Sequence, residues 1–148
     1  MNDARKTPWH LWLVGILGLL WNLIGVSDYV FARMKSDWYM REVGQFTPEQ
    51  IAWFHDFPLW ANVGWAFGVW GSLIGSILLL ARRRHAIIAF MASIAGLATM
   101  TLYQFILNGE KFTGLFGDGP MYFTAVIWAV VLGLTYYARR QTEVGVLR

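Results

Sequence analysis

Four long apolar runs alternate with shorter polar segments along the chain. The runs cover residues 9 to 31, 59 to 81, 86 to 107 and 120 to 138. Each run reaches the length of about 20 mostly apolar residues that a helix needs to cross a bilayer. The pattern predicts an all-α integral membrane protein, in which four helices form one up-and-down bundle over residues 1 to 148.

Small residues recur within the runs at the spacing of one helix face, which allows helices to approach closely in a bilayer. The second run carries two adjoining faces of this kind, so we expect it to contact two neighbours. These faces consist of Ala61, Gly64, Gly68, Gly71 and Gly75, and of Asn62, Trp65, Val69, Ser72 and Ser76. The fourth run offers a further packing face, whose members are Tyr122, Ala125, Ala129 and Gly133.

The polar segment between the first two runs contains the start signal of a short helix. Thr47 fits the N-cap, Pro48 fits the first helical position, and Gln50 completes a capping box. We expect this helix to lie on the outer surface of the membrane and to end before Pro58. Residues 108 to 119 contain four glycines, and there we expect a loop.

Positive charges gather at one end of the four runs. They are Arg5, Lys6, Arg82, Arg83, Arg84, Arg139, Arg140 and Arg148. Because cytoplasmic loops of membrane proteins retain lysine and arginine, both termini are predicted to be cytoplasmic. This topology, together with anionic lipid, explains the net charge of +3 without a nucleic-acid partner. The chain has no cysteine, which excludes disulfides and thiol chemistry.

Polar and aromatic side chains from every run are predicted to meet in the outer half of the bundle. Asn22 is the deep polar group, and its place on the small-residue face of the first run turns it towards protein. Asp28 falls near the outer edge, where a carboxylate stays hydrated. The candidate ligand-binding residues are Trp21, Asn22, Asp28, Tyr29, Asn62, Trp65, Tyr103, Gln104, Tyr122 and Trp128.

An outward-facing vestibule with this mixture of side chains suits a small neutral ligand. The amides and the carboxylate bond to hydroxyls of a sugar-like solute or a lipid headgroup, while tyrosine and tryptophan stack on apolar ring faces. The alternative is that the same residues only fill the bundle or anchor it at the membrane surface. A proton or ion carrier is disfavoured, because no carboxylate or histidine lies at depth.

The sequence contains no recognisable catalytic, metal or cofactor site. His10 and His85 belong to the cytoplasmic edge and His55 to the outer side, and no carboxylate neighbours the first two at ligand spacing. Phosphate-binding loops and nucleophile elbows are also absent from the sequence. We therefore expect a protein that is not an enzyme and that needs neither metal nor cofactor.

Five stretches form a specific combination that covers almost the whole chain. They are WNLIGVSDY, Tyr39-Met40, FTPEQIAWF, FPLWANVGWAFGVWGSLIGSILLLARRR and the end of the third run near Tyr103. This combination resembles a group of small four-span bacterial inner-membrane proteins that are often called sugar transporters. The resemblance implies a multi-pass protein of the bacterial inner membrane and favours transport, but it brings no catalytic or binding residues with it.

Two functions follow from these observations. The first is a transporter-like protein that binds or admits a small neutral, sugar-like solute through the outer vestibule. The second is a non-transporting accessory or assembly subunit of a membrane complex, which docks through the glycine-rich second run or the outer loop. In either case the expected neighbours are membrane lipids together with a second copy of the chain or another membrane protein.

Overall fold

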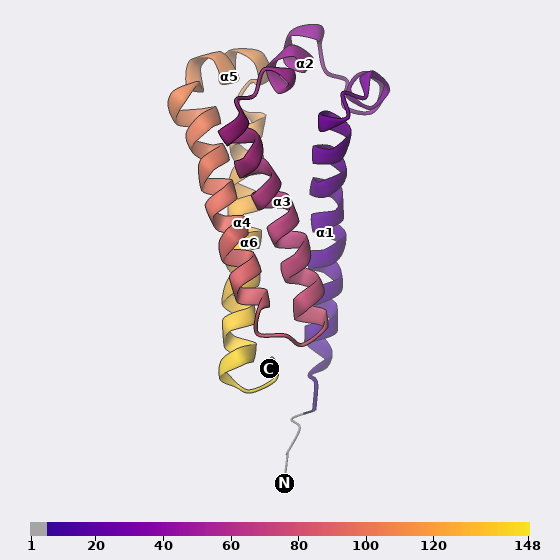
Figure 1. Ribbon diagram of the computed structural model, residues 1–148, viewed down its shortest axis with the longest axis vertical. Coiled ribbons are helices and arrows are strands. Elements are labelled where there is room, and N and C mark those ends of the chain that lie inside the picture. The colour runs from indigo at the N-terminus through magenta and orange to yellow at the C-terminus, as the bar shows by residue number, and fades with distance from the viewer. Residues whose placement is uncertain (1–5) are drawn as a thin grey trace.

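Four long helices stand side by side along the length of the molecule (Figure 1). The computed structural model describes residues 6 to 148 and confirms the predicted all-helical bundle. The four helices are α1 (Trp9–Arg33), α3 (Leu59–Leu80), α4 (Ala86–Thr101), which continues into the π-helical turn η2 (Leu102–Leu107), and α6 (Gly119–Glu143). Each of the four is long and apolar enough to cross a membrane, which makes the chain a multi-pass membrane protein.

Three short elements cover one end of the bundle, which we name the capped end (Figure 1). They are η1 (Tyr39–Val43), α2 (Pro48–His55) and α5 (Gly109–Phe116). The predicted short helix is confirmed as α2. Its capping box is complete, since the Gln50 N–H donates to Thr47 Oγ1 at 3.3 Å and the Thr47 N–H donates to Gln50 Oε1 at 3.0 Å.

The loop predicted for residues 108 to 119 is wrong, because α5 occupies most of it. Phe112 of this helix is only 3% exposed and contacts Trp53 of α2, with 5.7 Å between their ring centroids. Phe116 lies one turn later and contacts Phe54 of α2 at 5.6 Å. Aromatic burial of this size outweighs the low helix propensity of the glycines.

The helix α3 lies between α1 and α4 and packs on each through a separate face, as predicted. Its glycine face meets α4, where a Cβ on Gly71 would lie 2.9 Å from the backbone nitrogen of Ser93. The Ser93 hydroxyl donates to the Gly68 carbonyl at 2.5 Å, so side chain and backbone are in direct contact across this interface. The adjoining face meets α1, where Tyr29 contacts Trp65 with 5.2 Å between ring centroids.

The packing face predicted for the fourth run is wrong. Ala125, Ala129 and Gly133 are exposed on α6, and a Cβ on Gly133 would meet no atom within 4 Å. The helix buries its bulkier face instead, with Leu134 lying against the space left by Gly18 of α1. Small residues permit close approach, but in a bilayer helices associate through van der Waals packing, and here the contact of Leu134 with Gly18 turns the bulkier face inwards.

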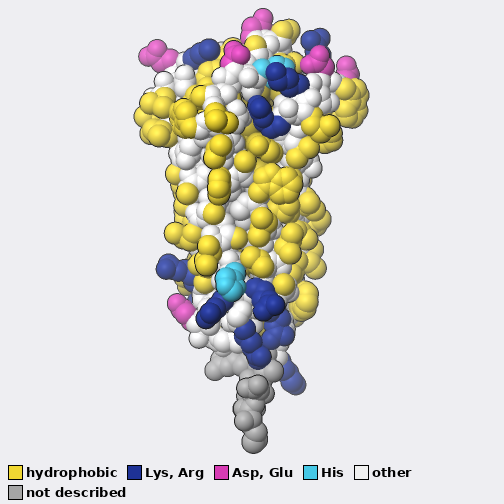
Figure 2. Space-filling model, viewed as in Figure 1, with side chains coloured by type: hydrophobic (Ala, Val, Ile, Leu, Met, Phe, Trp, Pro, Cys, Tyr) yellow, Lys and Arg dark blue, Asp and Glu magenta, His cyan; other side chains and the backbone are white. Residues whose placement is uncertain are grey.

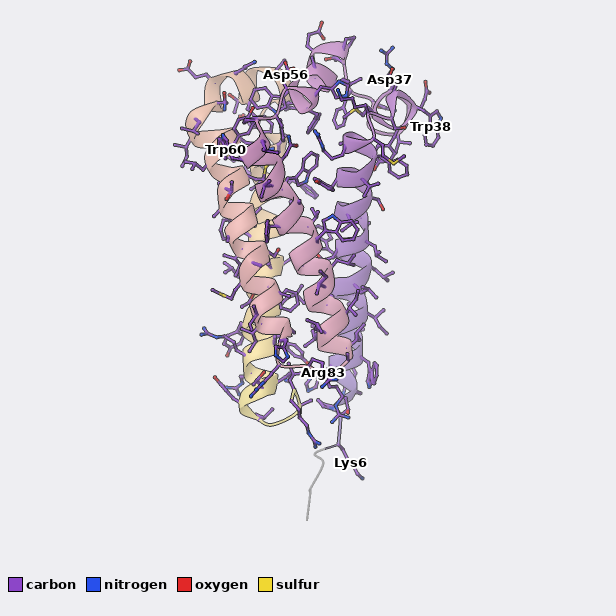
Figure 3. The ribbon with its side chains drawn as sticks, viewed as in Figure 1. Lys6, Asp37, Trp38, Asp56, Trp60 and Arg83 are labelled. Carbon is purple, nitrogen blue, oxygen red and sulfur yellow. The ribbon has the colours of Figure 1, made fainter. Side chains whose placement is uncertain are left out.

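The surface is apolar around the middle of the molecule and charged at both ends (Figure 2). Lys6 and Arg83 mark the end opposite the cap, which we name the basic end, while Trp38 and Trp60 lie at the capped end (Figure 3). The C-terminal end of the chain also lies at the basic end (Figure 1). Arg5 belongs to the predicted basic cluster but lies outside the described residues. That the basic end faces the cytoplasm stays a prediction.

The last residues of the chain close the basic end. Arg148 donates its backbone N–H to the Arg82 carbonyl and accepts from the Arg84 N–H, both at 2.9 Å. Val146 and Leu147 are buried in a cluster with Leu11, Leu79, Phe90 and Ala138. These side chains pack the interior between the helices near the basic end.

Candidate functional site

A cavity of about 550 Å³ occupies the half of the bundle that lies under the cap. All four long helices line it, and the cap contributes Met40 of η1, Phe46 of the following loop, Phe54 of α2, and Phe112 and Phe116 of α5. The volume falls within the range of about 300 to 1,000 Å³ that is typical of small-molecule sites. The cavity exists because α1 packs on α3 and α6 packs on α4, while α1 and α6 make few contacts with each other.

Asn22 lies with Ser72 and Ser93 in the part of the cavity furthest from the cap, which we name its floor. The amide nitrogen of Asn22 donates to the Ser76 hydroxyl at 2.9 Å and to the Ser72 carbonyl at 3.2 Å. These two bonds fix the side chain, which is 8% exposed, against α3. Because both bonds use the nitrogen, the amide oxygen of Asn22 is an acceptor at the floor of the cavity.

Asp28 and Tyr39 form the polar rim of the cavity. The Tyr39 hydroxyl donates to Asp28 Oδ1, and the Tyr39 ring stacks on Phe31 with 4.5 Å between centroids. These contacts hold η1 against the end of α1. Because the hydrogen bond to the carboxylate favours the neutral phenol, it raises the pKa of Tyr39 to about 12.

We expect the Tyr39–Asp28 bond to be visible in an alkaline titration. The folded-state pKa lies above the value of about 10 for a free tyrosine, so the bond stabilises the fold below pH 10 and this contribution is lost as the pH rises towards 12. Ultraviolet absorbance of tyrosinate measures the transition. Asp28→Asn should lower the pKa of Tyr39 towards 10. The variant should stay folded, because Asp28 is solvent-exposed. Unfolding of Asp28→Asn in detergent would contradict this expectation.

The walls of the cavity are mainly apolar. Trp65 of α3 contacts Phe54 of α2 with 6.0 Å between ring centroids, and both line the space. Trp21 of α1 contacts Phe123 of α6 across the gap between these helices, again with 6.0 Å between centroids. Phe123 is 56% exposed and Ile24 is 63% exposed. On this side, therefore, a few side chains separate the cavity from the surrounding membrane.

Half of the predicted site residues line the cavity. They are Trp21, Asn22, Asp28, Trp65 and Gln104. They share positions on the inward faces of α1 and α3 or at η2, where the helices diverge under the cap. Their convergence places polar groups at the floor, at the rim and near the cap.

The other predicted residues are engaged elsewhere. Asn62 donates to the Phe57 carbonyl at 2.9 Å, and Trp128 donates to the Thr101 hydroxyl at 3.1 Å. Tyr103 is buried in the aromatic cluster with Trp53 and Phe57. Tyr122 is 68% exposed, and Tyr29 packs edge-on against Trp65, so neither lines the cavity.

The aromatic residues of the cap and Tyr39 of the rim were not among the predicted site residues. Phe112 and Phe116 stand four positions apart, which places them on one helix face. The four-residue spacing could have indicated an amphipathic helix, but the neighbouring glycines favoured a loop. Among residues 6 to 148, no group of three or more histidine, aspartate or glutamate side chains is placed to bind a metal ion.

The cavity is therefore a small, largely apolar space with an amide at its floor and a phenol–carboxylate pair at its rim. Comparison with protein-family models, with curated proteins and with solved structures finds no match for this chain.

Proposed function

We propose that this chain binds a small neutral solute in the cavity under the cap and acts as a transporter-like protein. The observation that carries the proposal is the convergence of Asn22, Gln104 and Asp28 on one membrane-embedded space of about 550 Å³. A bacterial inner membrane is the proposed location, with the basic end in the cytoplasm, because positively charged segments are retained on that side.

The lining favours a solute with an extended apolar face and few hydroxyl groups over a fully hydroxylated sugar. A sugar would leave most of its hydroxyls against aromatic and aliphatic walls, and each unpaired polar group in such surroundings costs free energy. One or two hydroxyls find partners in the Asn22 oxygen and the Gln104 amide. The ring faces of Trp65 and Phe54 then cover the apolar part of the solute.

Asn22→Leu should abolish binding of such a solute. A ligand that binds only the folded state raises the thermal midpoint, so a panel of sugars, polyols, aliphatic alcohols and lipids identifies the class. Ser76→Ala is the control for a disturbed contact between α1 and α3, because Ser76 does not line the cavity and the bond from Asn22 to the Ser72 carbonyl still holds the amide. The shift should persist in Ser76→Ala and disappear in Asn22→Leu. A shift that Asn22→Leu leaves unchanged would exclude Asn22 from the site.

Proteoliposome uptake of the stabilising solute then separates transport from binding alone. Transport predicts uptake by the native chain and by Ser76→Ala but not by Asn22→Leu. If the native chain binds the solute but does not take it up, the transporter is rejected and a solute-binding protein remains.

The exposed small-residue face of α6 favours a second candidate, an accessory subunit that docks a membrane partner or a second copy. The glycine face of α3, which the sequence analysis assigned to docking, is occupied by α4. Ala125, Ala129 and Gly133 are exposed and permit close approach of another helix. A stoichiometric companion that copurifies from native membranes would support this candidate.

A further inference from the structure

A second hollow, of about 570 Å³, lies at the basic end between the start of α1 and the end of α6. Lys6, His10 and Arg140 line it, together with Tyr136 and Tyr137. None of the described residues that line this hollow is acidic. A hollow lined by two cationic side chains, Lys6 and Arg140, and by no carboxylate attracts an anion.

The hydrogen-bond donors around the hollow are suited to phosphate oxygens. His10 Nδ1 and the Tyr137 hydroxyl form a hydrogen bond of 2.5 Å, which fixes the imidazole and leaves Nε2 for another partner. Pro8 also lines the hollow and is the N-cap of α1, but it has no capping side chain. The first amides of α1 therefore add donors and the positive end of a helix dipole.

Gln141 provides an independent sign of an unfilled polar site. It lines the hollow, is 6% exposed, and leaves its buried amide oxygen without a hydrogen-bond partner. Buried polar groups are normally paired. The amide nitrogen of the same side chain makes no hydrogen bond to the described residues, so it can donate to a phosphate oxygen.

The hollow is also accessible from the membrane. Trp9 and Tyr136 are exposed beside it, and such rings are enriched at the level of lipid headgroups. Leu13 and Leu17 lie on the same face of α1 as His10, and both are exposed. An apolar surface thus runs from the hollow into the hydrocarbon region, as a lipid with its headgroup in the hollow requires.

We propose that this hollow binds the phosphate group of an anionic phospholipid, whose acyl chains run along the exposed leucines of α1. Lys6 and Arg140 supply the charge, His10 supplies a directed donor, and Gln141 supplies the buried amide. This site is independent of the cavity under the cap.

The test uses the full chain in neutral maltoside micelles, with phosphatidylglycerol, phosphatidylcholine or inorganic phosphate added. Phosphatidylglycerol should raise the thermal midpoint and remain bound as one lipid in native mass spectrometry. In Lys6→Gln/Arg140→Gln its affinity should fall by about 30-fold, from the loss of two cations at the membrane surface. The matched control is Arg83→Gln/Arg139→Gln, which removes the same charge from exposed residues at the same end that do not line the hollow.

The control variant should keep native affinity for phosphatidylglycerol. Equal losses in the two double variants would overturn the proposal, because the attraction would then come from surface charge in general. Equal stabilisation by phosphatidylcholine would overturn it by removing the requirement for an anion. The same stabilisation by inorganic phosphate alone would overturn the assignment to a lipid.

Discussion

Gly96→Ala is expected to lower the free energy of unfolding by about 3 kcal/mol, the upper end of the usual cost of overpacking. A Cβ on Gly96 of α4 would overlap the Gly64 carbonyl and the Gly68 nitrogen, and it would lie 2.9 Å from the Gly68 Cα. These are backbone atoms of α3, which no rotamer change moves away. The two central helices have to separate to admit one methyl group.

The same substitution at Gly133 is the control. Its Cβ would meet no atom within 4 Å, so Gly133→Ala should leave stability unchanged or raise it slightly through the better helix propensity of alanine. Thermal unfolding of both variants in one detergent, followed by tryptophan fluorescence, gives the comparison. Similar midpoints for Gly96→Ala and Gly133→Ala would show that α3 and α4 lie further apart than described.

The elements that the sequence predicted correctly are those determined by periodic, local patterns. The four spans follow from length and hydropathy, and α2 follows from its capping box. The two faces of α3 follow from residues that recur every three or four positions. In α6 the same argument failed, because its small residues and its bulky residues both form continuous faces. The competing burial of Leu134 against Gly18 is a tertiary effect that spacing does not reveal.

In the candidate site, too, the residues predicted correctly are those that a local pattern identifies. Asn22 and Asp28 were identified because a polar side chain inside an apolar run costs free energy unless it finds a hydrogen-bond partner or water. Asn62 met the same criterion, but its amide nitrogen bonds locally to the Phe57 carbonyl five residues earlier, and its buried amide oxygen has no partner. The cap residues depend on contacts between distant segments, such as Trp53 with Phe112. No sequence pattern within either segment predicts that contact.

Gly25→Leu should weaken solute binding strongly and leave the bundle intact. Gly25 lines the cavity, and the nearest atom to its Cβ would be Val69 Cγ1 at 3.8 Å, an ordinary contact. A leucine therefore extends into the empty space and does not push helices apart. A solute that shares the cavity with this side chain meets overpacking of about 1 to 3 kcal/mol, which weakens its affinity by about 5- to 150-fold.

Gly133→Leu adds the same side chain on the exposed face of α6 and serves as the control. If the cavity is the solute site, Gly25→Leu loses the thermal shift given by the solute and Gly133→Leu keeps it. If the chain is instead an accessory subunit that docks through α6, Gly133→Leu dissociates the partner and Gly25→Leu does not. The two variants thus separate the two functions, since each obstructs one surface and leaves the other unchanged. If each variant keeps the solute-induced thermal shift and also keeps the partner, the cavity is not the solute site and α6 is not the docking face.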